Sequence, residues 1–203
     1  MNETLYNLFY QIYPLSKEEF GVIMKSFKSE RYKKGSEILS YGQIERRTSL
    51  VLSGMVHQTV MIDGEVFTND ISLSGMHYNN LTSYLEESPS IEVQTALTDV
   101  EVLYLEKDAA EKLRYENHAF CYIYSKSWEM THSEREKRSY ILQNKNAYKR
   151  FDIFMKTNEN AKRYLEEVPQ RIIAEYLSLT PETLSRVKKE FLLKRECKLK
   201  AVC

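Results

Sequence analysis

The sequence predicts an α+β fold in which a β-barrel or jelly roll, a long helix and a pair of crossing helices follow one another. Three observations support this order. Glycines separate short apolar runs between Arg31 and Leu105, glycine is absent after Gly75, and apolar spacing typical of a helical hairpin lies near the C-terminus. The expected segments are residues 1–116, 117–146 and 147–203.

The first segment is predicted to consist of short antiparallel strands. Asp63-Gly64 separates two runs rich in β-forming residues, 59–62 and 65–68. This dipeptide is a strong hairpin signal, because a type I′ turn needs positive φ at both central residues. Many short strands separated by glycines favour a barrel or jelly roll over a βαβ fold.

The composition is that of a globular protein. Apolar residues make up 42% and charged residues 29% of the 203, values near the globular average. The chain has no run of about 18 apolar residues and no basic, then apolar, N-terminus, so we expect a cytoplasmic protein without a membrane partner. Cys121, Cys197 and Cys203 show no C-x-x-C pairing. We therefore expect reduced thiols, no metal site and no cofactor.

Residues 117–146 are predicted to form one long helix with a broad apolar stripe. The stripe comprises Phe120, Cys121, Ile123, Tyr124, Trp128, Met130 and Thr131. It is too wide for one small neighbour to cover, so the helix either packs across the barrel or pairs with its twin in a homodimer. A monomeric core helix is the third alternative. In the dimer, residues 134–138 would be solvated. A further helix is expected from about Ala147 to Leu165.

The segment from Val168 to Lys189 has the pattern of a helix-turn-helix. Apolar residues recur at helical spacing in two successive helices: Ile173, Leu177, Leu184, Val187 and Phe191. Pro169 suits the first position of the first helix, and Thr180 can cap the second helix. Ala174 is the small residue needed where two helices cross closely, and Leu179 would fill the gap at the turn.

A helix that enters the major groove of DNA must present side chains that read base edges. Glu182 and Arg186 are i,i+4 neighbours that point away from the apolar face; glutamate can accept from cytosine N4 and arginine can bind guanine in bidentate fashion. The alternative is an intrahelical salt bridge on a solvated face. The excess of eight basic over four acidic residues after Val168 favours double-stranded DNA as the partner. The other residues expected at this interface, mainly as phosphate contacts, are Gln170, Arg171, Thr180, Thr183, Ser185, Lys188 and Lys189.

The stretch from Pro169 to Arg186, PQRIIAEYLSLTPETLSR, resembles the cyclic-AMP receptor protein/Fnr superfamily of bacterial transcription regulators. Weaker similarities lie at Lys34-Gly35, Tyr41-Gly42 and residues 50–54. The resemblance implies a double-stranded β-helix sensor like a cyclic-nucleotide-binding domain, a dimerisation helix, and a C-terminal winged helix. It further implies that a homodimer binds a palindromic operator, with Glu182 and Arg186 reading bases and Ser185 beside them.

The expected nucleotide site departs from the pattern of that superfamily. Its cyclic-nucleotide-binding members usually carry Phe-Gly-Glu-x-x-Leu and then an arginine, and this chain lacks both. Between Arg47 and Lys107 there is no basic residue but there are nine acidic ones. Burial of a phosphate there without a cation would be costly, so the expected effector is an unidentified small molecule other than cyclic AMP. The residues expected to contact it are His77, Tyr78, Asn79, Asn80 and Ser90.

Three further departures concern the sensor and the hairpin. The clustered cysteines of oxygen-sensing members are missing, so no iron–sulfur sensor is expected. The sequence ends soon after the predicted recognition helix, which leaves room for only a short wing. Ser178 replaces the glycine common in the turn, a change that is tolerable if its φ is negative or only mildly strained.

Two rival functions were weighed against DNA binding. A metal enzyme of the cupin type needs clustered histidines, but His57, His77, His118 and His132 are scattered, so no enzyme is expected. A dimeric small-molecule sensor or scaffold with a vestigial helical hairpin remains the alternative, because it would share every structural element of the regulator.

Overall fold

The computed structural model describes the backbone of residues 3–200 and the side chains of residues 3–194. Its internal contacts divide the chain into two compact units, residues 1–131 and residues 132–203. The division falls within the long helix α5 (His118–Gln143). Among the described residues, none of the helices combines the length and the apolar character needed to cross a membrane.

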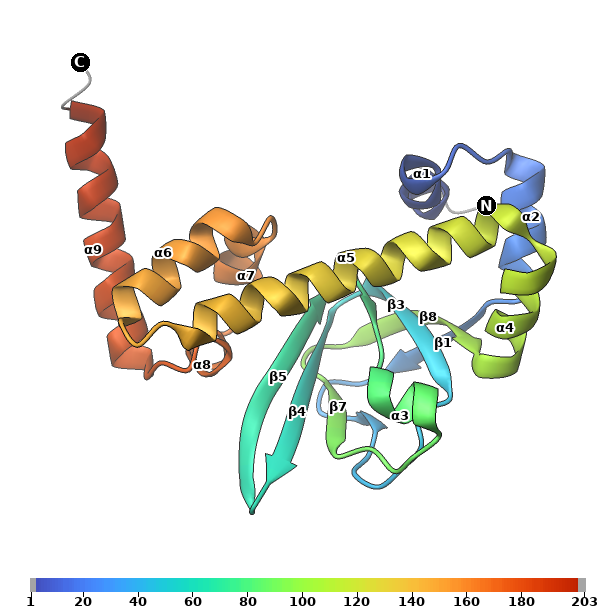
Figure 1. Cartoon of the computed structure of the whole chain (residues 1–203), viewed down its shortest axis with the longest axis horizontal. Helices are drawn as coiled ribbons and strands as arrows, with labels where there is room; N and C mark the ends of the chain where they lie inside the picture. Colours follow the sequence, from blue (N-terminus) through green and yellow to red (C-terminus); the bar gives the residue numbers. More distant parts are fainter. Residues whose placement is uncertain (1–2, 201–203) are drawn as a thin grey trace. The chain divides into compact units, whose positions relative to one another are not determined.

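The first unit is built on two four-stranded antiparallel sheets (Figure 1). One sheet has the order β1-β8-β3-β6 and the other β2-β7-β4-β5. The strands are β1 (Lys28–Tyr32), β2 (Glu37–Leu39), β3 (Arg47–Ser53), β4 (Met55–Ile62), β5 (Glu65–Leu73), β6 (His77–Tyr78), β7 (Glu92–Ala96) and β8 (Val100–Glu106). Apart from the β4–β5 hairpin, successive strands lie in different sheets, so the predicted jelly roll is confirmed.

The β4–β5 hairpin turns where the sequence predicted it. Ile62 pairs with Glu65 across the turn, and the φ angles of Asp63 and Gly64 are 53° and 82°. Both central residues therefore have the positive φ that a type I′ turn requires.

Four helices surround the sheets, and three of them were not expected. These are α1 (Glu3–Ile12), α2 (Lys17–Met24), α3 (Leu81–Glu86) and α4 (Lys107–Glu116). Of these, α1 and α2 precede the strands, and α3 lies within the range 31–105 that was expected to form strands only. Ser16 and Glu19 start α2 with a reciprocal capping box. Phe9 and Phe20 pack edge to face, their ring centroids 5.5 Å apart, in the cluster that also buries Phe120 of α5.

The first half of α5 packs on the barrel, which is one of the three alternatives given above. Phe120 and Ile123 are buried in one cluster with Leu103 and Leu105 of β8. Trp128 lies edge-on to His77, with ring centroids 4.6 Å apart. Met130 is 59% exposed, so the stripe is only partly covered within the chain.

The second unit contains α6 (Ala147–Thr157), α7 (Ala161–Glu167), α8 (Gln170–Tyr176) and α9 (Pro181–Lys200). The single helix expected from Ala147 to Leu165 is wrong, because the chain leaves the helix at Asn158 and re-enters it after Asn160. Phe154, Tyr164 and Tyr176 form an aromatic core with centroid separations of 5.6–6.3 Å.

The short wing expected after the recognition helix is also wrong for the described residues. The helix α9 continues unbroken to Lys200 (Figure 1), and residues 201–203 lie outside the described part. The sequence from 182 to 200 contains neither glycine nor proline, and an i,i+4 ion pair joins Glu190 and Lys194. These features favour helix over a β-wing.

Candidate nucleic-acid interface

Helices α8 and α9 cross over a small buried core, as the helix-turn-helix pattern predicts. Ala174 is fully buried, as are Ile173 on α8, its C-cap Leu177 and Leu184 on α9; Val187 is 2% exposed. Since Ala174 has only a methyl group, the two helices can approach closely at this point. The sequence identified this core because it depends on local spacing alone.

The turn between the helices is a Schellman motif. The amide of Leu179 donates to the Ala174 carbonyl (2.8 Å) and that of Ser178 donates to the Glu175 carbonyl (2.9 Å). These are the two hydrogen bonds that define the motif, in which the residue after the C-cap is left-handed. That residue is Ser178, with φ of 51°. Ser178 therefore does not have the negative φ that would make a serine easy to accommodate at this position.

The start of α9 is capped as expected. The Thr180 hydroxyl accepts from the Thr183 amide at 3.2 Å and Pro181 is the first helical residue. Hydrogen bonds from the Glu182 backbone amide and from the Thr180 hydroxyl lower the pKa of the Glu182 carboxyl. Glu182 is thus held as an anion at the positive end of the helix.

The predicted base readers are both exposed on the first two turns of α9. No ion pair joins Glu182 to Arg186 within the described part of the chain, so the intrahelical salt bridge weighed as the alternative is not formed. Ser185 and Lys189 are also exposed, whereas Lys188 is half-buried. Glu182, Ser185, Arg186 and Lys189 form one polar surface opposite Leu184 and Val187.

The two residues expected at the start of α8 differ in their contacts. Gln170 is exposed and directly follows Pro169, which occupies the N-cap rather than the first helical position. Arg171 forms an i,i+4 ion pair with Glu175, Nε to Oε1 2.9 Å. The Arg171 side chain is 82% exposed, so this ion pair is solvated and weak, and it leaves the guanidinium accessible to a phosphate.

Two arginines that sequence reasoning did not select contact the hairpin turn. Arg138 of α5 was expected to be solvated, but it is half-buried and donates to the Tyr176 carbonyl. Arg150 of α6 donates to the Ser178 carbonyl at 2.6 Å. No local signal identifies such residues, because their acceptors are backbone carbonyls 28 and 38 positions away.

The five residues expected to contact an effector lie in one region of the barrel, but several have structural contacts. The Tyr78 side chain is 1% exposed in a hydrophobic cluster. Asn80 caps α3 by accepting from the Ser83 amide, and Ser90 bonds to the backbone of Glu92. His77 shares a hydrogen bond with Thr48, and Asn79 is buried at 1% exposure.

A buried network of carboxylates and amides lies beside these residues. Glu45 and Glu92 are 5% and 2% exposed, and the Gln94 amide donates to both, at 3.0 and 3.2 Å. The amides of Gln58 and Asn69 also donate to Glu92. Burial raises the pKa of the Glu45 carboxyl, and the charge of Glu92 adds a smaller rise. The hydrogen bonds that Glu45 accepts lower the pKa, but burial is the larger effect. Sequence reasoning missed Glu45 because the loop before β3 gives no sign of facing inward.

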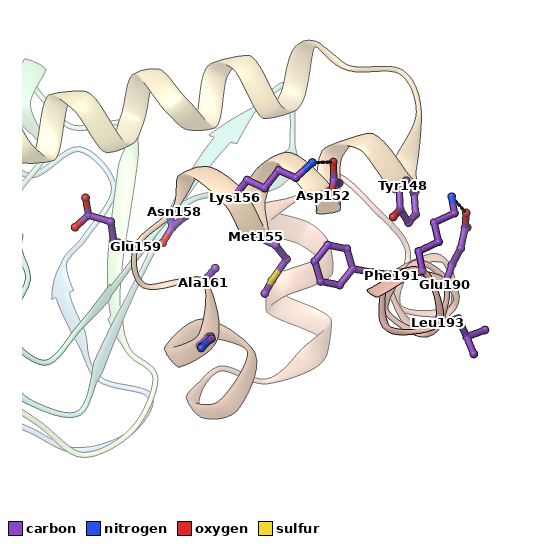
Figure 2. Close-up of a pocket in the computed structure, with 12 residues that line it drawn as sticks. Tyr148, Asp152, Met155, Lys156, Asn158, Glu159, Ala161, Glu190, Phe191 and Leu193 are labelled. Carbon is purple, nitrogen blue, oxygen red and sulfur yellow. Dashed lines mark hydrogen bonds and ion pairs between the residues drawn. The ribbon is translucent and has the colours of Figure 1, made fainter. Parts of the chain in front are cut away.

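A cavity of about 950 Å³ lies in the second unit between α6, α7 and α9 (Figure 2). Met155 and Phe191 point into it, and the ion pairs Asp152–Lys156 and Glu190–Lys194 lie near its edge. None of the predicted site residues lines this cavity.

Several solved structures are similar to this chain in fold. A CooA mutant from Carboxydothermus hydrogenoformans is 19% identical, with a TM-score of 0.66 over 86% of this chain and 79% of that chain. FixK2 from Bradyrhizobium japonicum is 22% identical, with a TM-score of 0.62 over 83% and 85%. Catabolite Activator Protein from Thermus thermophilus is 18% identical, with a TM-score of 0.55 over 92% and 87%.

No model of a protein family matches the sequence, and no curated protein matches it. At these identities the structural likeness establishes the fold. Of the fold expected from the resemblance to the cyclic-AMP receptor protein/Fnr superfamily, the β-roll, the long helix and the helix-turn-helix are therefore confirmed, whereas the wing is not.

Proposed function

We propose that this protein is a homodimeric transcription regulator that binds a palindromic operator in double-stranded DNA. The observation that carries the proposal is the exposed polar surface of α9, where Glu182 and Arg186 flank a well-packed helix-turn-helix core without pairing to each other within the described residues. The fold shared with Catabolite Activator Protein and FixK2 supports the same conclusion.

The chemistry of the surface suits base recognition in the major groove. The guanidinium of Arg186 has the donor geometry for guanine O6 and N7, and the ionised Glu182 can accept from cytosine N4. Gln170, Arg171, Lys188 and Lys189 are assigned to phosphates, which would position the helix without reading sequence.

Dimerisation through α5 would place two recognition helices about 34 Å apart, one turn of DNA. Exposed apolar side chains on α5 support this role: Met130 is 59%, Tyr140 53% and Tyr122 45% exposed. Sedimentation velocity on the full chain tests it. A dimer that dissociates on Met130→Glu substitution is expected, and a concentration-independent monomer would contradict the proposal.

Selection of bound duplexes from a random library tests DNA recognition. A palindromic consensus is expected. Arg186→Ala should then weaken binding by about 1–3 kcal/mol and relax preference at one base pair per half-site. Lys188→Gln is the matched control: it should weaken all sequences alike and lower the salt slope by about 1. Failure to enrich any sequence would favour the dimeric scaffold with a vestigial hairpin.

The barrel is proposed to sense an effector other than cyclic AMP, whose binding shifts the equilibrium between two dimer arrangements. The buried carboxylates Glu45 and Glu92 support this exclusion, because a phosphate beside them would be both desolvated and repelled. Titration calorimetry should detect no cyclic-AMP binding; micromolar affinity would overturn the assignment.

A further inference from the structure

Three successive carbonyls at the C-terminus of α8 and in the turn after it, those of Tyr176, Leu177 and Ser178, accept hydrogen bonds from arginine side chains. In a Schellman motif the turn's own amides bind the carbonyls of earlier residues, here Ala174 and Glu175. The carbonyls of Tyr176, the last helical residue, and of its C-cap Leu177 then need other donors, because the last carbonyls of a helix have no partner within it. The Ser178 carbonyl lies in the turn itself. Arg138 and Arg150 supply those donors from two different helices.

Arg138 binds the Tyr176 residue in two ways. Its Nε and one terminal nitrogen both donate to the Tyr176 carbonyl, at 3.3 and 3.2 Å. Its guanidinium carbon also lies 4.5 Å from the centroid of the Tyr176 ring. A planar guanidinium can make both contacts at once, whereas an ammonium lacks the flat face and the forked donors.

Arg150 of α6 binds the next two carbonyls. One terminal nitrogen donates to the Leu177 carbonyl at 3.3 Å and to the Ser178 carbonyl at 2.6 Å. Its Nε donates to the carbonyl of Asn144, in the loop between α5 and α6. This one side chain therefore ties the end of α5 to the left-handed residue of the turn.

The electrostatics favour this arrangement. The C-terminal end of a helix carries partial negative charge, and cations placed there are stabilising. Both arginines are half-buried, so water screens their hydrogen bonds less than it screens the ion pair of Arg171 and Glu175 on the surface of α8.

We propose that Arg138 and Arg150 are positioning residues for the recognition helix: they fix the turn, and thereby the direction of α9, to the end of α5. The inference rests on the proposed DNA-binding function. Thr180 caps α9 and lies only two residues after Ser178, whose carbonyl Arg150 binds. A displaced turn therefore changes where α9 begins.

The test compares three single variants of the full chain, Arg138→Gln, Arg150→Gln and Lys149→Gln. Lys149 is exposed at the start of α6, so its variant loses the same charge without touching the turn. Affinity for the duplex selected by the wild-type protein is measured at several salt concentrations, and hydrogen exchange is measured at the amides of residues 177–184. Denaturation in urea confirms that each variant is folded.

Both Arg138→Gln and Arg150→Gln should lower the affinity for the operator on the order of tenfold, a typical size for coupling between separate sites. The salt slope should stay unchanged, because no phosphate contact is lost. Exchange at Ser178 and Leu179 should accelerate in both variants and not in Lys149→Gln. Arg138→Lys, which keeps the charge but not the forked donors, should fall between wild type and Arg138→Gln.

Two results would overturn the inference. The first is hydrogen exchange at the turn that stays at the wild-type rate in both Arg138→Gln and Arg150→Gln. The second is a loss of affinity accompanied by a drop of about 1 in the salt slope, which identifies a direct phosphate contact. If the wild-type protein selects no duplex, the proposed function fails. The exchange measurement then still decides by itself whether the arginines hold the turn.

Discussion

Replacement of Ser178 by glycine should stabilise the C-terminal unit, although the change removes a side chain. Ser178 has φ of 51°, a conformation in which the Cβ of an L-residue crowds the following carbonyl. Relief of that crowding is worth about 1–2 kcal/mol. Glycine also makes the unfolded chain more flexible, which costs about 0.4–1 kcal/mol.

The net expected gain is about 0.8 kcal/mol in the free energy of unfolding. The Ser178 hydroxyl makes no hydrogen bond within the described part of the chain, and the side chain is exposed, so little else is lost. If the C-terminal unit unfolds independently, the melting temperature should rise by about 3–6 °C.

Thermal and urea denaturation measure the change, with two matched controls. Ser178→Ala keeps Cβ and should give no gain. Ser139→Gly makes the same substitution at an exposed position inside α5, where it should destabilise by about 0.5 kcal/mol. Equal behaviour of the two glycine variants, or a gain from alanine as large as from glycine, would refute the strain argument.

Three other substitutions test the barrel and the hairpin core. Burial raises the pKa of the Glu45 carboxyl, so the free energy of unfolding that this group contributes should be fully present below the ordinary pKa of 4.5 and lost as pH rises through the raised value. Urea denaturation of Glu45→Gln at several pH values should lack that decline. A pH profile identical to that of the wild-type protein would contradict the raised pKa. Gly54→Ala places a Cβ 2.2 Å from the Asp99 carbonyl at φ of +82° and should cost about 3 kcal/mol, clearly more than Gly64→Ala, which has the same φ and open space. Ala174→Leu should force α8 and α9 apart at a cost of about 1–3 kcal/mol, and an unchanged melting temperature would refute the close crossing.

The features predicted correctly from sequence are those fixed by neighbouring residues. Asp63-Gly64 specifies its own turn, and the spacing from Ile173 to Val187 specifies two crossing helices. The capping pattern of Ser16 and Glu19 was equally local, so α2 was available to sequence reasoning and was overlooked. The same holds for the helix break at residues 158–160, where asparagines flank a short polar stretch.

The features that escaped prediction depend on contacts between distant residues. Arg138 looks like part of a charged, solvated run, and only the fold shows that its guanidinium lies on Tyr176. Among the nine acidic residues counted between Arg47 and Lys107, Glu92 alone is buried. The second inward carboxylate is Glu45, which lies outside the region that the count covered.

The burial of Glu45 and Glu92 changes the physical reason for excluding a cyclic nucleotide from the barrel. The obstacle is a specific buried pair, Glu45 and Glu92, rather than a generally acidic wall. The amides of Gln58, Asn69 and Gln94, which are donors that a phosphate would need, already donate to these two carboxylates. A phosphate could recruit them only by leaving a buried carboxylate without its donors, and it would add a third negative charge in a low dielectric. Since each of these effects opposes binding, an effector that enters this barrel must do so without an unpaired anionic group.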